Sequence, residues 1–340
     1  MSTVTKHSFR TNGFRRNGRS HVRDQLRESV DELFIGLLDH VTRTLGDEEA
    51  TEQTVERSLD DLFLALRTRK LSSGEEEWHE FIDTCRRHPL KTLLHQDPFT
   101  YRAYARPRGY AGDAILMDYI YGCEERWAAP EASPVGRRVF KYTTAAPASE
   151  GVRSRRGFVA DLIDRLAGKK PDLQVLSVAA GHLREANLSA AVRRGKIARF
   201  VAVDGDEESM KEVERCYSCY RVETVTARIR KLLANRIDLG RFDLVYTTGL
   251  FDYLEESTGR RLVHNMFQML RPGGQLVVAN FLPDIRDIGY METFMDWNLV
   301  YRTRREMIDL TMEIPQPKIR DIRLFAEENQ NIIFLQVIRN

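Results

Sequence analysis

The chain has 340 residues, which is the length of about two domains, and 42% of them are hydrophobic, which is enough for a packed core. Its 52 basic and 50 acidic residues leave a net charge of +2, which argues against nucleic acid as the main partner. No apolar run is long enough to span a membrane, and four cysteines are too few for a disulfide scaffold, so we expect a cytoplasmic protein without nucleic-acid or membrane partners.

The first half of the chain has the pattern of helices. Residues 1–21 are polar and basic, and we expect them to form a disordered tail. From Val22 to about Leu94, apolar residues recur at steps of three and four, which predicts a small antiparallel helical bundle. A further helix is expected through Met117 and Ile120. The prolines after it mark a predicted linker region: Pro130, Pro134 and Pro147.

After Pro171, short apolar runs alternate with helical stretches, and this alternation predicts a parallel sheet covered by helices on both faces. The predicted strands are residues 174–179, 200–203, 242–247, 274–281 and 331–338. We therefore divide the chain into a tail (1–21), a helical substrate-covering domain (22–147) and an α/β domain (148–340).

Ligands of such sheets bind at the carboxyl ends of the strands. Here the small residues Ala179, Ala180 and Gly181 follow the first strand, and they let a ligand approach the backbone and the free N–H groups of the next helix. Asp204 ends the second strand, where a carboxylate can accept both hydroxyl groups of a ribose. Gly249 lies in a polar turn after a later strand. Each feature alone has a structural explanation, such as a tight turn or a helix cap.

The order of these features resembles that of the class I S-adenosylmethionine (SAM)-dependent methyltransferases. The resemblance implies a Rossmann-like fold, with a doubly wound, mostly parallel seven-stranded sheet, preceded here by an all-helical N-terminal domain. The competing interpretation, a nicotinamide-binding domain, would require a fuller glycine motif than Gly181 alone. The expected SAM-binding residues are Ala179, Ala180, Gly181, Asp204, Gly249 and Arg153. Arg108 or Arg156 could take the place of Arg153 at the methionine carboxylate or pair with an acidic substrate, and a solvated helix face is the alternative for Arg153 and Arg156. Ala179 stands where glycine is usual, and the turn tolerates it if its φ stays negative.

Three longer segments carry a narrower resemblance. They are Arg106-Pro-Arg-Gly-Tyr-Ala-Gly-Asp113, Gly249-Leu-Phe-Asp-Tyr253, and Tyr290-Met-Glu through Asp296-Trp-Asn-Leu-Val-Tyr-Arg302. In these segments the chain is similar to bacterial 3-hydroxy-fatty-acid methyl ester biosynthesis methyltransferases, which make quorum signals. That similarity implies a small-molecule substrate and a loop around Tyr110 that covers the pocket. The family pattern resembles Gly-Cys where this chain has Ala179-Ala180.

We expect Asp252, Tyr110 and Asp113 to be catalytic, with Asp252 acting as a base or orienting one. Their structural alternatives are a helix cap for Asp252 and a tight turn with an aspartate cap for the other two. The expected substrate-binding residues are Tyr104, Arg108, Tyr253, Trp297 and Tyr301. The last two are four residues apart on one predicted helix face, where aromatic residues are more often core.

No cluster of residues predicts a metal site, and Cys216 and Cys219 are interpreted as structural thiols. The predicted function is methylation of a carboxylate or hydroxyl group on a fatty-acid-like or secondary metabolite. The alternatives are N-methylation of an amine or guanidine metabolite, and a non-catalytic regulator that binds SAM. Formation of a homodimer is left open.

Overall fold

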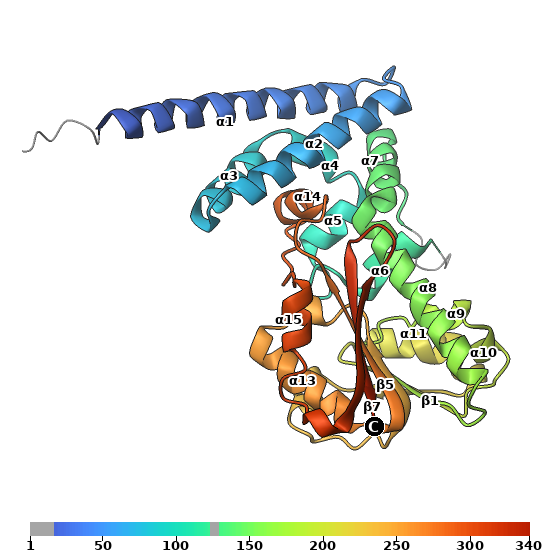
Figure 1. The fold of residues 1–340 in the computed structure, drawn as a ribbon. Coiled ribbons are helices and arrows are strands. Elements are labelled where there is room, and N and C mark those ends of the chain that lie inside the picture. The colour runs from blue at the N-terminus through green and yellow to red at the C-terminus, as the bar shows by residue number, and fades with distance from the viewer. Residues whose placement is uncertain (1–16, 123–128) are drawn as a thin grey trace, which may run out of the picture.

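The computed structural model describes residues 17–122 and 129–340. A helical region comes first and covers one end of an α/β region (Figure 1). Its helices are α1 (Asn17–Gly46), α2 (Glu52–Ser72), α3 (Glu75–Arg87), α4 (Leu90–Leu94), α5 (Pro98–Ala105), α6 (Ala114–Tyr121), α7 (Pro134–Ala145) and α8 (Pro147–Ala167). The predicted tail lies outside the described residues as far as residue 16, and α1 begins at Asn17, before the expected start at Val22.

The segment predicted as a linker contains a helix instead. Pro134 and Pro147 each occupy the first turn of a helix, α7 and α8. Proline lacks an N–H group, and the first turn is the one place in a helix where that group has no partner within the helix. Ser133 caps α7 by accepting a hydrogen bond from the backbone N–H of Gly136. The linker prediction was therefore wrong because these prolines begin helices.

The α/β region contains one seven-stranded sheet with the order β3-β2-β1-β4-β5-β7-β6. The strands are β1 (Gln174–Val178), β2 (Arg199–Asp204), β3 (Val222–Thr226), β4 (Phe242–Thr247), β5 (Leu270–Phe281), β6 (Ile319–Ala326) and β7 (Ile332–Arg339). Strands β1 to β5 pair in parallel, whereas β7 is antiparallel to both β5 and β6. This confirms the predicted fold class, with β3 and β6 added to the strands expected from the sequence.

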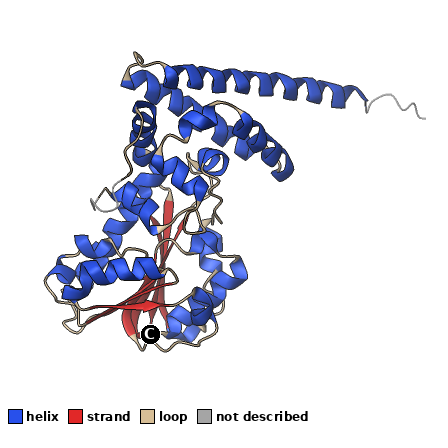
Figure 2. Cartoon of the chain, turned by 180° about the vertical axis from the view of Figure 1, so that it is seen from behind, coloured by secondary structure: helices blue, strands red, loops and turns tan. Residues whose placement is uncertain are grey.

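Helices cover both faces of the sheet, with α8, α10 and α11 on one and α13 and α15 on the other (Figures 1 and 2). The elements between and after the strands are α9 (Glu185–Leu188), α10 (Ala190–Arg193), α11 (Glu207–Tyr217), η2 (Ser218–Tyr220), α12 (Ile229–Leu233), η3 (Phe251–Tyr253), α13 (Glu256–Gln268), α14 (Ile288–Phe294), α15 (Arg304–Asp309) and η4 (Gln316–Lys318). Among the described helices, none has a stretch long and apolar enough to cross a bilayer.

Side-chain alternation along the strands divides the core in two. Val175 of β1 belongs to a buried cluster that continues into the helical region, whereas Leu176 belongs to a second cluster beneath α13 and α15. Successive strand residues point to opposite faces of a sheet, so neighbours in β1 enter different clusters. The first cluster includes Phe99 of α5 and Leu116 of α6 as well as Phe281 of β5. The helical region therefore shares a continuous core with the sheet.

Candidate active site

A cavity of about 640 Å³ lies at the carboxyl ends of β1, β2 and β4. In open α/β sheets this is the edge at which ligands bind. Its walls come from five places: the turns after the strands, the loop of residues 106–113, helix α6, helix α8 and the segment around Trp297. The helical region thus closes a cavity that the sheet begins. Ten of the sequence-predicted site residues line the cavity: Arg108, Tyr110, Ala179, Ala180, Gly181, Asp204, Gly249, Asp252, Tyr253 and Trp297.

The turn after β1, residues 179–183, which we call the cofactor loop, has a left-handed backbone at three positions. The φ angles are 54° at Ala179, 52° at Gly181 and 52° at Leu183. A negative φ was the condition for tolerating alanine at position 179, and the structure does not meet that condition. A residue with a Cβ atom in this conformation costs about 1–2 kcal/mol, so the surrounding contacts must hold the loop. One such contact is the Ala180 N–H group, which donates to the Val203 carbonyl of β2 at 3.1 Å.

Two features favour glycine at position 181: its positive φ and its close approach to helix α6. A Cβ atom there would lie 3.3 Å from the Cβ of Ala114, at the start of α6. Helix α6 therefore packs directly on the cofactor loop, and a Cβ atom at position 181 would push Ala114 away by a few tenths of an ångström as well as adopt a positive φ.

Asp204 ends β2 and faces the cavity beside the cofactor loop. Its Oδ2 accepts a hydrogen bond from the Gly181 N–H at 2.8 Å, and its Oδ1 accepts one from the Asp206 N–H at 2.9 Å. Burial raises the pKa of Asp204, although these amide hydrogen bonds act in the opposite direction. Each carboxylate oxygen keeps a second lone pair, so the group can still accept hydrogen bonds from a diol.

The loop of residues 106–113, which we call the covering loop, is fastened across the same side of the cavity. Arg108 donates from Nη1 to Asp206 Oδ2 at 2.7 Å and to Ser209 Oγ at 3.0 Å. Tyr110 lines the cavity near Asp204, and burial, together with the nearby carboxylates, raises the pKa of its phenol. Tyr110 therefore keeps its proton at neutral pH and can donate a hydrogen bond into the cavity, but it cannot act as a base.

At the other end of the cavity, Asp252 lies in η3, just beyond β4. Its Oδ1 accepts a hydrogen bond from the Phe281 N–H at 2.8 Å, and its Oδ2 lies 3.9 Å from Arg155 Nη1. Burial raises the pKa of Asp252 to about 6, against the opposing effect of Arg155. Helix α13 takes Glu255 as its N-cap residue, so Asp252 does not cap that helix. A buried carboxylate that ionises near neutral pH is suited to accept a proton.

Tyr253 and Trp297 form an aromatic wall beside Asp252. The Trp297 Nε1–H group donates to the Tyr253 hydroxyl at 2.8 Å. The covering loop crosses this pair at Gly112, where a Cβ atom would overlap the Tyr253 hydroxyl and come within 2.7 Å of Trp297 Cζ2. The predicted helix through Trp297 and Tyr301 was wrong, because residues 296–303 have no regular structure. Among the described residues, the buried Tyr301 hydroxyl has no hydrogen-bond partner, and Tyr301 does not line the cavity.

Arg155, and not the expected Arg153, lines the cavity. Arg153 donates from Nη1 to the carbonyls of Thr144 at 2.6 Å and Ile120 at 3.3 Å, and it does not reach the cavity. Arg155 lines the cavity, and its guanidinium lies 3.3 Å from the position that a Cβ atom of Gly249 would take. Its buried Nε has no hydrogen-bond partner among the described residues. Arg155 can therefore receive a carboxylate.

Two further predicted residues lie outside the cavity wall. Asp113 caps α6 through the Leu116 N–H at 2.8 Å, and it accepts a two-pronged ion pair from Arg102 at 2.9 and 2.6 Å. Tyr104 accepts a hydrogen bond from Lys91 at 2.9 Å. Asp113 thus anchors one end of the covering loop. In the described part of the chain, no group of three His, Cys, Asp or Glu residues could hold a metal ion.

These residues offer three kinds of contact, which follow the order of the strands. Arg155 offers a cation beside Gly249 after β4, Asp204 at the end of β2 offers an acceptor for a diol, and Ala227, Ile229 and Leu232 offer an apolar surface after β3. A ligand with a carboxylate, a ribose and a flat ring fits this order. SAM has these three parts.

Comparisons with known proteins agree with a SAM-binding site. The family described as methyltransferase domain matches residues 175–274. None of the curated proteins matches the chain. A crystal structure from Bordetella parapertussis, described as a possible exported protein, is 16% identical and has a TM-score of 0.54 over 82% of this chain and 96% of that one. This share is larger than residues 148–340 alone, so the likeness in fold extends into the helical region.

Two structures with bound S-adenosylhomocysteine are more distant. The magnesium protoporphyrin IX methyltransferase of Synechocystis is 13% identical, with a TM-score of 0.45 over 72% of this chain and all of that one. The N-methyltransferase NodS of Bradyrhizobium japonicum is 14% identical, with a TM-score of 0.40 over 57% of this chain and 89% of that one. The sheet order, the cavity and the matching domain family establish that the chain contains a class I SAM-dependent methyltransferase domain. It is an enzyme, and SAM is its cofactor.

Proposed function

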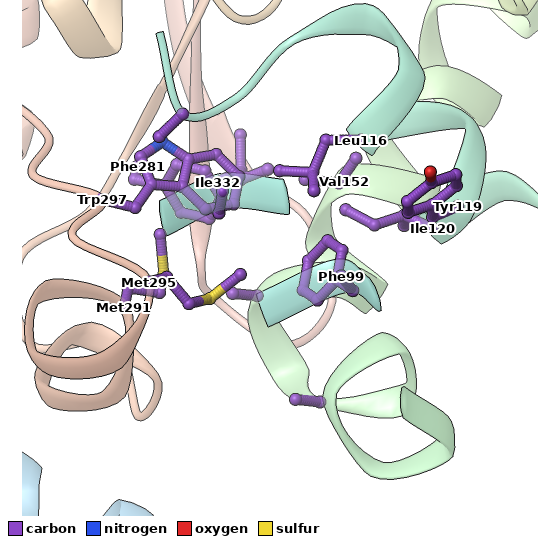
Figure 3. Packing of buried hydrophobic residues seen from close by; sticks show 14 of the residues in the cluster. Phe99, Leu116, Tyr119, Ile120, Val152, Phe281, Met291, Met295, Trp297 and Ile332 are labelled. Atoms are coloured by element: carbon purple, nitrogen blue, oxygen red, sulfur yellow. The ribbon is translucent and has the colours of Figure 1, made fainter. Parts of the chain in front are cut away.

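We propose that the enzyme methylates a carboxylate or hydroxyl group on a small molecule with an apolar portion, such as a fatty-acid-like or secondary metabolite. The observation that carries this proposal is a narrow apolar crevice of about 20 Å³ that shares part of its lining with the cavity, so an acceptor chain enters it only when the surrounding side chains repack. Trp297, Phe281 and Val152 line both spaces. Met291 and Met295 also line the crevice, and Figure 3 labels both among the buried apolar side chains. Methionine side chains are unbranched and flexible, so they can repack around an inserted chain.

The chemistry required of the protein is modest, because SAM supplies an activated methyl group. Alignment of the acceptor with that methyl group can contribute about 7–11 kcal/mol. For a hydroxyl acceptor, Asp252 takes the proton, and its pKa of about 6 leaves it ionised at neutral pH. A carboxylate acceptor needs no base. In this proposal, Tyr253 donates a hydrogen bond to the acceptor beside Asp252. Tyr110 donates a hydrogen bond into the cavity from the side of Asp204, and Asp113 positions it by anchoring the covering loop.

In the same proposal, Arg155 replaces Arg153 as the partner of the SAM carboxylate, while Asp204 receives the ribose. The cofactor loop, Ala179 to Gly181, and Gly249 surround the methionine portion. Two observations support this arrangement: these residues all line the cavity, and the buried Arg155 Nε beside Gly249 has no hydrogen-bond partner among the described residues.

The second candidate is methylation of an amine or guanidine. Asp252, Tyr253 and Trp297 form an acidic and aromatic wall, and such a wall attracts a cation through its charge and its ring faces. The same residues therefore support two acceptor classes, which the experiment below separates.

The resemblance of the segments around Asp113, Tyr253 and Trp297 to the 3-hydroxy-fatty-acid methyl ester biosynthesis methyltransferases favours an acceptor with a carboxylate on an apolar chain. A cytoplasmic location is also part of the proposal. Its support is that the described cysteines, Cys85, Cys216 and Cys219, are all free thiols. The proposed partner is a small molecule, without nucleic acid.

The experiment offers methyl-labelled SAM with three acceptors that share one saturated chain and differ only at the reactive group: an acid, an alcohol and an amine. Alkaline treatment releases labelled methanol from a methyl ester but not from an ether or a methylamine. We expect transfer to the acid or the alcohol. Labelling of the amine alone would favour the second candidate, and labelling of none would reject the proposed acceptor class.

Asp252→Asn tests the role of the base, and Asp97→Asn is its matched control. Asp97 is also a fully buried carboxyl whose pKa burial raises to about 6, but it lies at the start of α5, outside the cavity. With an alcohol, we expect Asp252→Asn to lose transfer while Asp97→Asn retains it. Equal loss in both variants would assign the effect to the fold.

A further inference from the structure

A buried cluster of charges joins the helical region to the cofactor loop. Asp118 lies on α6, and its carboxylate accepts hydrogen bonds from Arg184 Nε and Nη2, both at 2.7 Å. The same carboxylate lies 2.7 Å from His182 Nδ1. His182 and Arg184 flank Leu183 at the end of the cofactor loop. All three charged or polar side chains are at most 1% exposed.

The cluster continues into the helix after β2. Arg184 Nη2 also pairs with Glu212 of α11 at 3.0 Å. Helix α11 begins after Asp206, the residue that Arg108 of the covering loop holds. The helical region therefore contacts the cofactor side of the sheet at two places. Arg108 binds Asp206, and Asp118 binds His182 of the cofactor loop and Arg184 directly after it.

The position of Asp118 matters because the loop has a backbone that would not persist unaided. Ala179 and Leu183 both have φ near +50°, a region that residues with a Cβ atom rarely adopt. Such conformations persist where neighbouring contacts over-determine them. His182 and Arg184 are those contacts for the distal half of the loop, and both are oriented by one carboxylate from outside the α/β region.

The electrostatics agree with this role. Burial raises the pKa of Asp118, but hydrogen bonds from Arg184 and His182 outweigh it and hold the pKa below its usual value. Asp118 is therefore charged in the folded protein. Removing it would leave the Arg184 guanidinium with less compensation in a buried site, and the loop would rearrange to give that cation access to solvent or to other acceptors.

We propose that Asp118 is a positioning residue for SAM: from the helical region, it holds the cofactor loop in its left-handed, binding-competent conformation. The affinity for SAM then depends on a residue that belongs to the substrate-covering part of the chain. This inference goes beyond the proposed acceptor and does not depend on it, because it concerns cofactor binding alone. Asp118 also lines the cavity, but its carboxylate is directed to His182 and Arg184.

The test measures the dissociation constants of SAM and S-adenosylhomocysteine by calorimetry for Asp118→Asn and Asp118→Ala in the full-length chain. If the competent loop falls to a tenth of the molecules, the apparent dissociation constant rises about tenfold, and we expect at least this for the alanine variant. Asparagine keeps the shape and one acceptor oxygen, so its loss should be smaller. If the alanine variant does not fold, the asparagine variant decides.

Asp243→Asn is the matched control. Asp243 is a buried carboxylate at the opposite end of the sheet, where it accepts from Lys170 at 2.6 Å and from the Gln174 N–H at 2.8 Å. We expect this control to lower the melting temperature without changing SAM affinity. For the Asp118 variants, the KM for SAM should rise while kcat at saturating SAM stays close to that of the parent. Unchanged SAM affinity in a folded Asp118→Asn protein, or an equal loss in the control, would overturn the proposal.

Discussion

The left-handed backbone at Ala179 gives a direct test of the cofactor loop at the scale of one residue. Glycine there would relieve about 1–2 kcal/mol of strain but lose about 0.4–1 kcal/mol through the greater freedom of the unfolded chain. We expect Ala179→Gly to keep SAM affinity and to raise the free energy of unfolding by at most about 1.6 kcal/mol, the largest difference between these two terms. Urea unfolding and calorimetry measure both quantities.

Valine at the same position provides the contrast, because a β-branched side chain fits a positive φ poorly. We expect Ala179→Val to lower both stability and SAM affinity. If glycine destabilised the protein by more than valine does, the positive φ at Ala179 would be refuted.

Asp252 predicts how activity depends on pH. Its pKa is raised to about 6 by burial, and only the ionised carboxylate can accept a proton from a hydroxyl acceptor. We therefore expect kcat/KM to rise with pH through about 6. Asp252→Asn should reduce kcat by about 10²-fold, the lower end of general-base contributions, and should abolish this rise. An unchanged pH profile in the variant would show that another group accepts the proton.

The same shift has a consequence for stability. A folded pKa of about 6, above the unfolded value near 4, means that the folded protein binds this proton more tightly. Its stabilising contribution is present below about pH 4 and is lost as pH rises to about 6. We expect Asp252→Asn to be more stable than the parent at pH 8, by at most about 3 kcal/mol, and similar to it at pH 4. Urea unfolding at both pH values measures this difference in stability. The pKa of about 6 already includes the opposing effect of Arg155.

At the scale of elements, α14 depends on one glycine. A Cβ atom at Gly289 would lie 2.5 Å from the carbonyl carbon of Leu66 and 2.7 Å from the nitrogen of Arg67, both in the backbone of α2. Gly289→Ala must therefore push α14 away from α2, at a cost of about 1–3 kcal/mol or more. Because α14 carries Met291 beside the apolar crevice, we expect the KM for the acceptor to rise more than the KM for SAM.

Gly157→Ala is the control for this prediction. Gly157 lies within α8, and a Cβ atom there would meet no heavy atom within 4 Å. Replacing glycine by alanine inside a helix should raise the free energy of unfolding by about 0.5–1 kcal/mol and leave both KM values unchanged. A harmless Gly289→Ala substitution would mean that α14 is not packed against α2 as described.

The elements that the sequence predicted, and those it did not, differ in burial. β1, β2, β4 and β5 lie in the interior of the sheet and appear in the sequence as near-continuous apolar runs. β3 and β6 are the two edge strands, and their side chains are mostly exposed or half-buried, as the charged Glu223 and Arg323 illustrate. Because these edge strands bury few side chains, their sequences show no clear alternation of apolar and polar residues from which a strand could be predicted.

The site was predictable where it follows the strands and less so where it depends on the phase of a helix. Asp204 and Gly181 follow from strand ends. Arg153 and Arg155 are two residues apart on α8, which places them about 200° apart around the helix, so only one can face the cavity. The sequence does not fix that rotation, because it is set by the packing of α8 on the sheet. Asp118 gave no signal either, since its partners are more than sixty residues away in sequence.

At the scale of the whole molecule, the helical and α/β regions share one core. Phe99 and Leu116 of the helical region pack in the same buried cluster as Phe281 and Ile332 of the sheet (Figure 3). Separating the regions would expose these side chains, at about 25 cal/mol for each Å² of apolar surface. The predicted boundary between residues 147 and 148 thus lies at the beginning of α8, a helix that packs against elements of both regions.

This continuous core predicts that the chain unfolds as one unit, although two domains of this size often unfold separately. We expect a single calorimetric transition whose van't Hoff and calorimetric enthalpies agree. Saturation with SAM at 100 times its dissociation constant should stabilise that whole transition by about 2.7 kcal/mol. A fragment of residues 148–340 should aggregate, because Phe281 and Ile332 would lose their cover. Two transitions, of which SAM shifts only one, would show that the regions fold independently, and the shared core would then contribute little to their coupling.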